Sequence, residues 1–345
     1  MTAYTEVVKQ VFDGFGSTNA SSLASAVVDF EIKLANVTPD AETQENVTMY
    51  YNPLTLEETR QLVPEISFGK IISSLAPSGY KPDRVIVGSP SYMKSLSSIL
   101  QNTTSETIRS FLGLKIIQGY AYAVEDPKVK PIKAFRNQLS GKDPEAVQER
   151  WRKCIRILDA GLPWSLSRFY ILDSFSEGSK KLGDEIIRDI KEQFIFTLDQ
   201  ASWMSPDVRK LAKEKVGNIV QLIGYSTRNP NVADAEDVKK YYNGLEISNA
   251  NFFENELATA RFDSRRAWSK LGKPTVRHEW DMSMPTVNAY YNPPGNEIAF
   301  PAGVMQPPTF YGDRTPKFLT YGAFGSVSGH ELSHGKLKKK KKKKR

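Results

Sequence analysis

The feature that most constrains the fold of this chain is the six-residue segment His330-Glu331-Leu332-Ser333-His334-Gly335. On an α-helix, residues four positions apart lie on one face, about one turn from each other. Both imidazoles can then reach the same ion. The segment therefore predicts a helix that carries a metal site.

The residues before this segment support a helix. Phe324, Val327, His330, Glu331 and His334 follow a helical pattern of spacings, which places them on one face. Several small residues on the same stretch are poor helix formers but permit close packing: Gly322, Ala323, Gly325, Ser326, Ser328 and Gly329. We expect a tightly buried helix.

The pattern H-E-x-x-H is typical of zinc peptidases. Neutral imidazole binds zinc well, and a catalytic zinc ion usually has three protein ligands and a water molecule. Glu331 would then lie beside that water and act as a general base in attack on a peptide carbonyl. The alternative is a chance pair of histidines on a surface helix, but the chain contains only three histidines.

A β-hairpin is expected shortly before this helix. Asn288-Ala289-Tyr290-Tyr291 precedes a turn-forming cluster at 292–296, and the apolar segment 297–300 follows. A strand with a free edge could hold an extended peptide through main-chain hydrogen bonds. The alternative is a purely structural hairpin.

Taken in order, these segments resemble the neprilysin and endothelin-converting-enzyme family of zinc metallopeptidases. The resemblance covers essentially residues 1–335. The segments that carry it are Trp151-Arg152-Lys153-Cys154, Trp203-Met204 and the helix after it, Asn288 to Tyr291, Phe300 to Pro308, and Gly329 to Gly335.

The resemblance implies a role for each matching residue. His330 and His334 would be ligands of one Zn²⁺ ion, and Glu331 would be the general base. Asn288 would hydrogen-bond the substrate backbone through its side chain, and Ala289 would pair with it through its own backbone. The substrates would be oligopeptides, and the protein would be extracellular or a membrane-anchored ectodomain.

The resemblance also implies the fold class, which is mainly α. We expect a partial helical capping lobe over residues 1–280, followed at 281–335 by the start of a thermolysin-like catalytic lobe with the hairpin and the zinc helix. The change in composition after Leu271 places the boundary near 275–285. Residues 336–345 form a lysine-rich tail that does not look native.

The chain departs from the family at both ends. The family's third zinc ligand, a glutamate in a Glu-x-x-x-Asp motif, lies on a later helix, whereas the ten residues after Gly335 contain no carboxylate or histidine. We therefore expect a fragment that binds zinc weakly and is a poor or inactive peptidase. The alternative is a non-catalytic short form that binds peptides or a partner. The sequence does not predict the oligomeric state.

The start of the chain shows no signal-peptide pattern, and no apolar stretch is long enough for a transmembrane helix. Cys154 is the only cysteine. In family members with disulfides, the cysteine at this position pairs with one farther upstream. Its absence indicates a missing N-terminal segment, or else a branch of the family with few disulfides.

The formal net charge of +8 comes from the tail, because nine basic groups lie in the last ten residues and leave about −1 for the rest. The charge is therefore no argument for nucleic-acid binding. The lysine run has three explanations: a translated polyadenosine stretch, an added tag, or a natural basic tail.

Four N-glycosylation sequons agree with a secretory route. Their asparagines are Asn19, Asn36, Asn46 and Asn102.

Helical periodicity extends over most of the chain before residue 272. One helix is expected to start at Asp143-Pro144-Glu145 and to turn Val147, Trp151, Cys154 and Leu158 inward, and another to run from Ser205 to near Gly224. Other helices are expected at about 20–35, 55–64, 89–100, 103–123, 164–175, 179–200, 234–242 and 249–271, with a strand at 84–88. His278 is expected to be a structural or surface histidine, not a third metal ligand.

Overall fold

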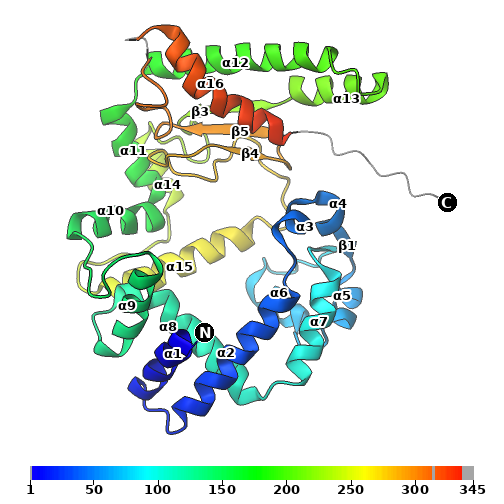
Figure 1. The fold of residues 1–345 in the computed structure, drawn as a ribbon. Helices are drawn as coiled ribbons and strands as arrows, with labels where there is room; N and C mark the ends of the chain where they lie inside the picture. Colours follow the sequence, from blue (N-terminus) through cyan, green and yellow to red (C-terminus); the bar gives the residue numbers. More distant parts are fainter. Residues whose placement is uncertain (1, 313–314, 336–345) are drawn as a thin grey trace, which may run out of the picture. The chain divides into compact units, whose positions relative to one another are not determined.

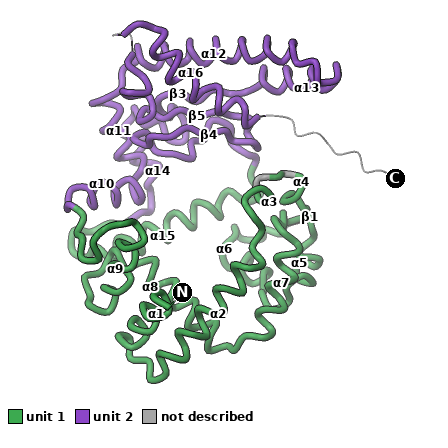
Figure 2. The backbone as a smooth tube through the Cα atoms, viewed as in Figure 1, with its two compact units in different colours: residues 1–148, 246–273 green, residues 149–245, 274–345 purple. Residues whose placement is uncertain are grey.

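A computed structural model of the chain describes residues 2–312 and 315–335. The lysine-rich tail predicted at 336–345 lies outside the described residues. The chain forms two compact units (Figure 2). Unit 1 contains residues 1–148 and 246–273, and unit 2 contains residues 149–245 and 274–345. The structure thus groups residues 149–245 with the helix that carries the histidine pair. The boundary expected at residue 280 between the family's lobes remains a prediction.

Unit 1 is built almost entirely from helices (Figure 1). Its two short strands, β1 and β2, pair antiparallel. The elements are α1 (Thr2–Gly14), α2 (Ala20–Val37), α3 (Ala41–Glu45), α4 (Val47–Tyr50), β1 (Asn52–Leu54), α5 (Leu56–Leu62), α6 (Phe68–Leu75), β2 (Val85–Val87), α7 (Pro90–Gln101), α8 (Ser105–Tyr120), η1 (Ala121–Ala123), η2 (Pro127–Val129), α9 (Lys130–Leu139) and α15 (Phe252–Ser269).

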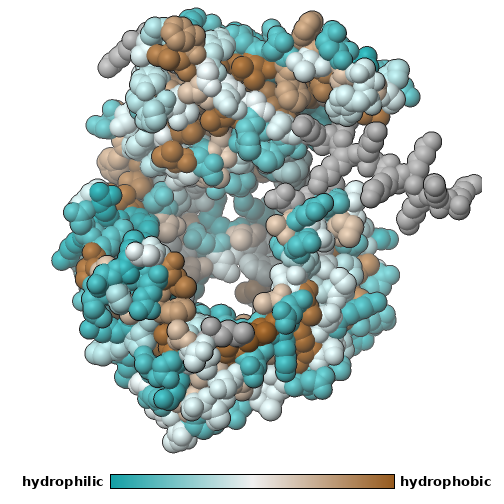
Figure 3. Space-filling model, in the orientation of Figure 1, coloured by the Kyte–Doolittle hydropathy of each residue, from teal (hydrophilic) through white to brown (hydrophobic). Residues whose placement is uncertain are grey.

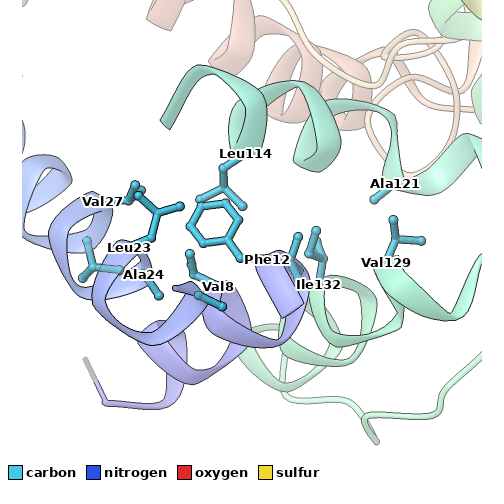
Figure 4. Close-up of a cluster of buried hydrophobic side chains, with 12 residues drawn as sticks. Val8, Phe12, Leu23, Ala24, Val27, Leu114, Ala121, Val129 and Ile132 are labelled. Atoms are coloured by element: carbon cyan, nitrogen blue, oxygen red, sulfur yellow. The ribbon is translucent and has the colours of Figure 1, made fainter. Parts of the chain in front are cut away.

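The core of unit 1 forms where α1 and α2 pack against α8 and α9 (Figure 4). Phe12 of α1 and Leu114 of α8 are both buried there, together with apolar residues of α2 such as Val27. Because these residues recur at helical spacing, each helix turns one apolar stripe inward. Burial of these stripes holds unit 1 together independently of the metal centre.

Helix starts in unit 1 follow side-chain capping. At α5, Thr55 Oγ1 accepts from the Glu58 backbone N–H at 3.1 Å, and the Glu58 carboxylate accepts from the Thr55 backbone N–H at 2.7 Å. These two bonds form a capping box. At α8 the cap is Thr104. Thr104 Oγ1 accepts from Thr107 N–H, whereas the Thr103 hydroxyl donates to the preceding helix at Ile99.

The helix predicted to start at Asp143 does not form there. The Asn137 side-chain amide donates to the carbonyl oxygens of Pro144 and Ala146, both at 2.9 Å. Those carbonyls therefore accept from a side chain instead of from helical N–H groups. The helix, α10 (Arg150–Gly161), begins seven residues later than Asp143.

The face predicted for α10 was also wrong. Val147 lies outside the helix and is 93% exposed, and Trp151, Cys154 and Leu158 are also exposed. The contacts of α10 with other elements are made mainly to α11 (Pro163–Ser174). Periodicity gives the amphipathic stripe but not the partner that covers it.

Unit 2 combines helices with a three-stranded sheet of order β3-β5-β4. β4 and β5 form the predicted hairpin, and β3 pairs parallel with β5. The elements of unit 2, besides α10 and α11, are α12 (Glu177–Asp199), α13 (Pro206–Gly217), β3 (Val220–Gly224), α14 (Ala235–Tyr241), β4 (Tyr290–Asn292), β5 (Glu297–Pro301) and α16 (Lys317–His334).

Helices cover both faces of this sheet (Figure 1). On β5, Ile298 and Phe300 belong to the cluster formed with α12 and α16, whereas Ala299 belongs to the cluster formed with α11 and α14. This alternation is the period of two that a strand imposes. β5 is buried along its whole length, so the sheet is a rigid support for α16.

Strand β3 was not predicted, because the helix before it was expected to continue to Gly224. The helix ends at Gly217, where the Asn218 backbone N–H bonds to Glu214 O at 3.0 Å. The aliphatic residues that follow pair with β5, a partner almost 80 positions away in the sequence. Such a strand depends on a distant partner that local patterning does not show.

The surface of both units carries scattered apolar side chains (Figure 3). Phe169 and Phe318 are examples in unit 2, with exposed fractions of 71% and 72%. Among the described residues, none of the helices combines the length and the apolar character needed to cross a membrane.

Candidate metal centre

The metal-site helix α16 is fixed through its buried face. Phe324 is fully buried and packs edge-on against the rings of Phe300 and Phe310, each with ring centroids 5.3 Å away. Leu332 is fully buried in the same cluster. Aromatic pairs in this geometry add to the free energy gained by burial. The exposed side of α16 carries His330 and His334.

Helix α12 packs against α16 (Figure 1). The Tyr321 hydroxyl donates a hydrogen bond to the Asp189 carboxylate, and Lys317 Nζ lies 3.3 Å from Glu185 Oε1. Gly325 permits the close approach, because a Cβ at that position would lie 3.2 Å from Ile190 Cδ1. Only some of the small residues noted in the sequence lie on the packed face of α16. Gly325 and Ser328 are buried, but Gly322 and Ser326 are exposed.

The predicted metal-binding residues lie together on the last turns of α16. Ligand atoms of His330, Glu331 and His334 all lie within 4.8 Å of one another. The two Nε2 atoms are 3.0 Å apart, and both imidazoles are exposed. Glu331 differs from them, since only 5% of it is exposed. The expectation of a tightly buried helix therefore holds for Glu331 but not for the two histidines, which are exposed.

This geometry fits a zinc ion. Two nitrogens at about 2.05 Å from a tetrahedral zinc lie about 3.3 Å apart. The observed 3.0 Å is within a few tenths of an ångström of that spacing. Small side-chain rotations are enough to reach it, and the exposed face leaves room for further ligands.

Burial governs the protonation of Glu331. Removal of its carboxylate from water raises its pKa, and the nearby His334 and His330 act in the opposite direction. A carboxylate with a raised pKa holds a proton more readily than an exposed one.

The hairpin places its edge strand beside α16. Tyr291 of β4 packs against the end of the helix, where a Cβ on Gly335 would lie 3.7 Å from the Tyr291 ring. β4 pairs with β5 on one side only. Asn288 is exposed and Ala289 is buried just before this strand. The Asn288 carboxamide oxygen accepts from the Ala289 backbone N–H at 2.9 Å.

Comparison with known proteins identifies the family. Two models described as peptidase family M13 match this chain, the N-terminal one over residues 1–226 and the second over residues 288–343. The chain belongs to peptidase family M13. The resemblance expected from the sequence is thereby confirmed.

Curated M13 relatives are similar over nearly the whole chain. An endothelin-converting enzyme homolog of Locusta migratoria is 28% identical over 97% of this chain and 47% of its own length. Neprilysin-3 of Drosophila melanogaster is 29% identical over 97% of this chain and 43% of its own length. Human endothelin-converting enzyme 1 is 30% identical over 89% of this chain and 40% of its own length. The chain thus spans less than half the length of these relatives.

Solved structures confirm the mainly helical fold. The crystal structure of PEPO from Lactobacillus rhamnosis HN001 has a TM-score of 0.82 at 22% identity, over 96% of this chain and 51% of that one. The Mycobacterium tuberculosis zinc metalloprotease ZMP1, solved with an inhibitor, has a TM-score of 0.81 at 23% identity, over 97% of this chain and 49% of that one.

The remaining histidine of the chain does not join the candidate metal group. Within residues 2–312 and 315–335, the candidate metal group contains only His330, Glu331 and His334. His278 is outside it, and its backbone N–H donates to Glu297 Oε1 at 2.8 Å.

The four sequon asparagines all belong to unit 1. Asn19, Asn36 and Asn102 are exposed, and Asn46 is half-buried. Their glycosylation remains a prediction.

Sequence reasoning missed the residues that position the metal helix. Tyr321, Gly325, Ser328 and Leu332 follow a spacing of three and four, which defines the buried face of α16. This spacing is a local signal in the sequence, on the face of the helix next to the one that carries the histidines. Asp189, the acceptor for Tyr321, gives no local signal, because it lies 132 positions earlier in the chain.

Proposed function

We propose that this chain forms the zinc-binding helix, the general base and the substrate strand of a metalloendopeptidase that hydrolyses oligopeptides. The observation that carries this proposal is the grouping of His330, Glu331 and His334 within 4.8 Å on an anchored helix. Membership of family M13 supports the same reaction class.

In this proposal, His330 and His334 hold the ion through their Nε2 atoms. A bound zinc ion supplies a Lewis acid for the peptide carbonyl and acidifies water. Glu331 accepts a proton from the attacking water at a carboxylate oxygen and then delivers it to the nitrogen of the leaving amine. Its burial keeps bulk water away from that carboxylate, and the fully buried Leu332 anchors the helix turn that carries it.

The strand edge before β4 would hold the substrate. An extended peptide pairs with an exposed edge through main-chain hydrogen bonds. In the structure, the Asn288 side chain bonds to the Ala289 N–H. We propose that a substrate carbonyl replaces it, which releases the Asn288 carboxamide to bond the peptide backbone.

For the 345-residue chain itself, we propose weak zinc binding and little turnover. A catalytic zinc ion usually has three protein ligands, whereas the described residues offer two histidines and the base. The same observation favours the second candidate function, a non-catalytic form that binds peptides at the β4 edge.

A zinc and activity assay separates these possibilities. Zinc should leave the purified chain during gel filtration, and residual cleavage of a quenched fluorescent peptide should fall about 100-fold or more in Glu331→Gln. Ser326→Ala, an exposed change on the same helix, should retain the residual rate. Retained zinc would contradict weak binding, and equal rates in Glu331→Gln would contradict the role of Glu331. Peptide binding without turnover would establish the second candidate.

We also propose that the natural protein is an ectodomain or an extracellular protein, as the sequons and the M13 membership suggest. Treatment of the natural protein with an N-glycosidase should lower its mass, and replacement of all four sequon asparagines by glutamine should remove that change. An unchanged mass would contradict the placement.

A further inference from the structure

Unit 2 contains a hollow that is separate from the candidate metal group. Its volume is about 160 Å³, and its lining includes Lys180 of α12, Gln221 and Tyr225 in and after β3, Arg228, and His278 with Trp280. β3 and β4 flank β5 on opposite sides. The hollow therefore lies at the β3 side of the sheet, and not at the edge next to Asn288.

The charge of the lining is positive. It includes no aspartate or glutamate. Lys180 is half-buried, with Nζ 3.7 Å from the centre of the Tyr225 ring, and burial lowers the pKa of this amine while Glu177 acts in the opposite direction. The Glu177 carboxylate accepts the hydrogen bond of the Tyr225 hydroxyl. Within the described part of the chain, neither Lys180 nor Arg228 forms a close ion pair.

A neutral polar group in the hollow also lacks a partner. The Oε1 atom of Gln221 is buried and accepts no hydrogen bond from any described residue. Buried polar atoms are usually hydrogen-bonded, so such an atom indicates a missing partner. A ligand that suits this lining has acceptor oxygens for the cations and one hydroxyl for Gln221.

The backbone at His278 is fixed in an unfavourable conformation. Its φ is +68°, in the left-handed region, and its N–H donates to the Glu297 carboxylate. Glu297 is 2% exposed, and Arg277 lies 4.0 Å from it and donates to Gly295 O. Backbone strain of this kind is retained where the surrounding structure imposes it, often at binding sites. His278, with this conformation, is one of the residues that line the hollow.

We propose that this hollow binds a small oxyanion of the phosphate class, either inorganic phosphate or a small phosphomonoester. Arg228 and Lys180 supply charge-assisted hydrogen bonds, Gln221 accepts from the ligand's hydroxyl, and Thr227, which also lines the hollow, is a further donor. The hollow has room for several water molecules, and therefore for the five heavy atoms of phosphate. The site is independent of the zinc chemistry.

Calorimetric titration of the 345-residue chain with inorganic phosphate tests this assignment. Arg228 is exposed, so Arg228→Ala should fold and should weaken phosphate binding about tenfold or more. Lys180→Ala should do the same. The matched control is Lys181→Ala, an exposed lysine on the same helix that does not line the hollow. The lysine-rich tail is present in every variant, so its nonspecific contribution cancels.

Acetate and glycerol phosphate complete the design. Acetate lacks the hydroxyl at neutral pH and should bind at least about tenfold more weakly than phosphate, whereas glycerol phosphate binding would identify a phosphomonoester site. Three results would overturn the proposal: no saturable phosphate binding, equal loss in Lys181→Ala and Arg228→Ala, or equal affinity for acetate and phosphate.

Discussion

The anchoring of the metal helix can be tested by removing the Phe324 side chain. Phe324 is fully buried, and its ring contacts both Phe300 and Phe310. Phe→Ala changes at such sites lower the free energy of unfolding by about 3–5 kcal/mol, through lost burial and the cavity that remains. With a urea m value of about 2 kcal/mol/M, the unfolding midpoint of unit 2 should fall by about 1.5–2.5 M.

The control for this change lies on the same helix. Phe318 is 72% exposed, so Phe318→Ala should change the free energy of unfolding by less than about 0.5 kcal/mol. Tryptophan fluorescence during urea titration reports unit 2 through the buried Trp164 and Trp280. If Phe324→Ala prevents folding, Phe324→Leu gives a smaller, measurable loss. A loss below about 1 kcal/mol for Phe324→Ala, or equal losses for both alanine variants, would refute the packing argument.

Three further predictions concern the surroundings of the site and unit 1. The side chains of Lys317 and Glu185 are 68% and 43% exposed, so their ion pair should stabilise the fold only weakly. A double-mutant cycle should give a coupling free energy below about 1 kcal/mol, and a larger value would contradict this expectation. The hydrogen bond to Asp189 raises the pKa of Tyr321 to about 12, from about 10 in an unfolded chain. The stabilisation of the folded state by this hydrogen bond is therefore complete below pH about 10 and is lost as the pH approaches about 12. In a pH titration followed by tyrosinate absorbance, one group should ionise at higher pH than the other tyrosines, and this group should be missing in Tyr321→Phe. An unchanged titration in that variant would refute the raised pKa of Tyr321. In unit 1, Thr55→Ala should lower the free energy of unfolding by about 1 kcal/mol, as measured by urea unfolding. Thr55→Ser should lower it much less, because serine keeps the hydroxyl through which the Thr55 side chain caps α5. Equal losses in the two variants would exclude capping.

The sequence determined the parts of the fold that depend on neighbours in the chain. The capping box at Thr55, the helix start at Pro90 and the hairpin around 292–296 all have their signals within a few residues. The metal group was predictable for the same reason, because His330, Glu331 and His334 need only the geometry of one helix.

The errors arose where contacts from outside the element itself decide the structure. Asn137 occupies the carbonyls of Pro144 and Ala146 and so prevents the helix predicted at Asp143. β3 depends on β5, and the position of α16 depends on Asp189. Such contacts come from tertiary packing, which one-dimensional periodicity does not contain.

Zinc K-edge X-ray absorption on the zinc-loaded chain can identify the zinc ligands, because it reports the atoms around the ion itself. We expect two imidazole nitrogens at about 2.0–2.1 Å, with oxygen in the remaining positions. The imidazole signal should disappear in the His330→Ala, His334→Ala double variant. A spectrum unchanged in that variant, or a sulfur ligand at about 2.3 Å from Cys154, would contradict the assignment of this helix as the metal centre.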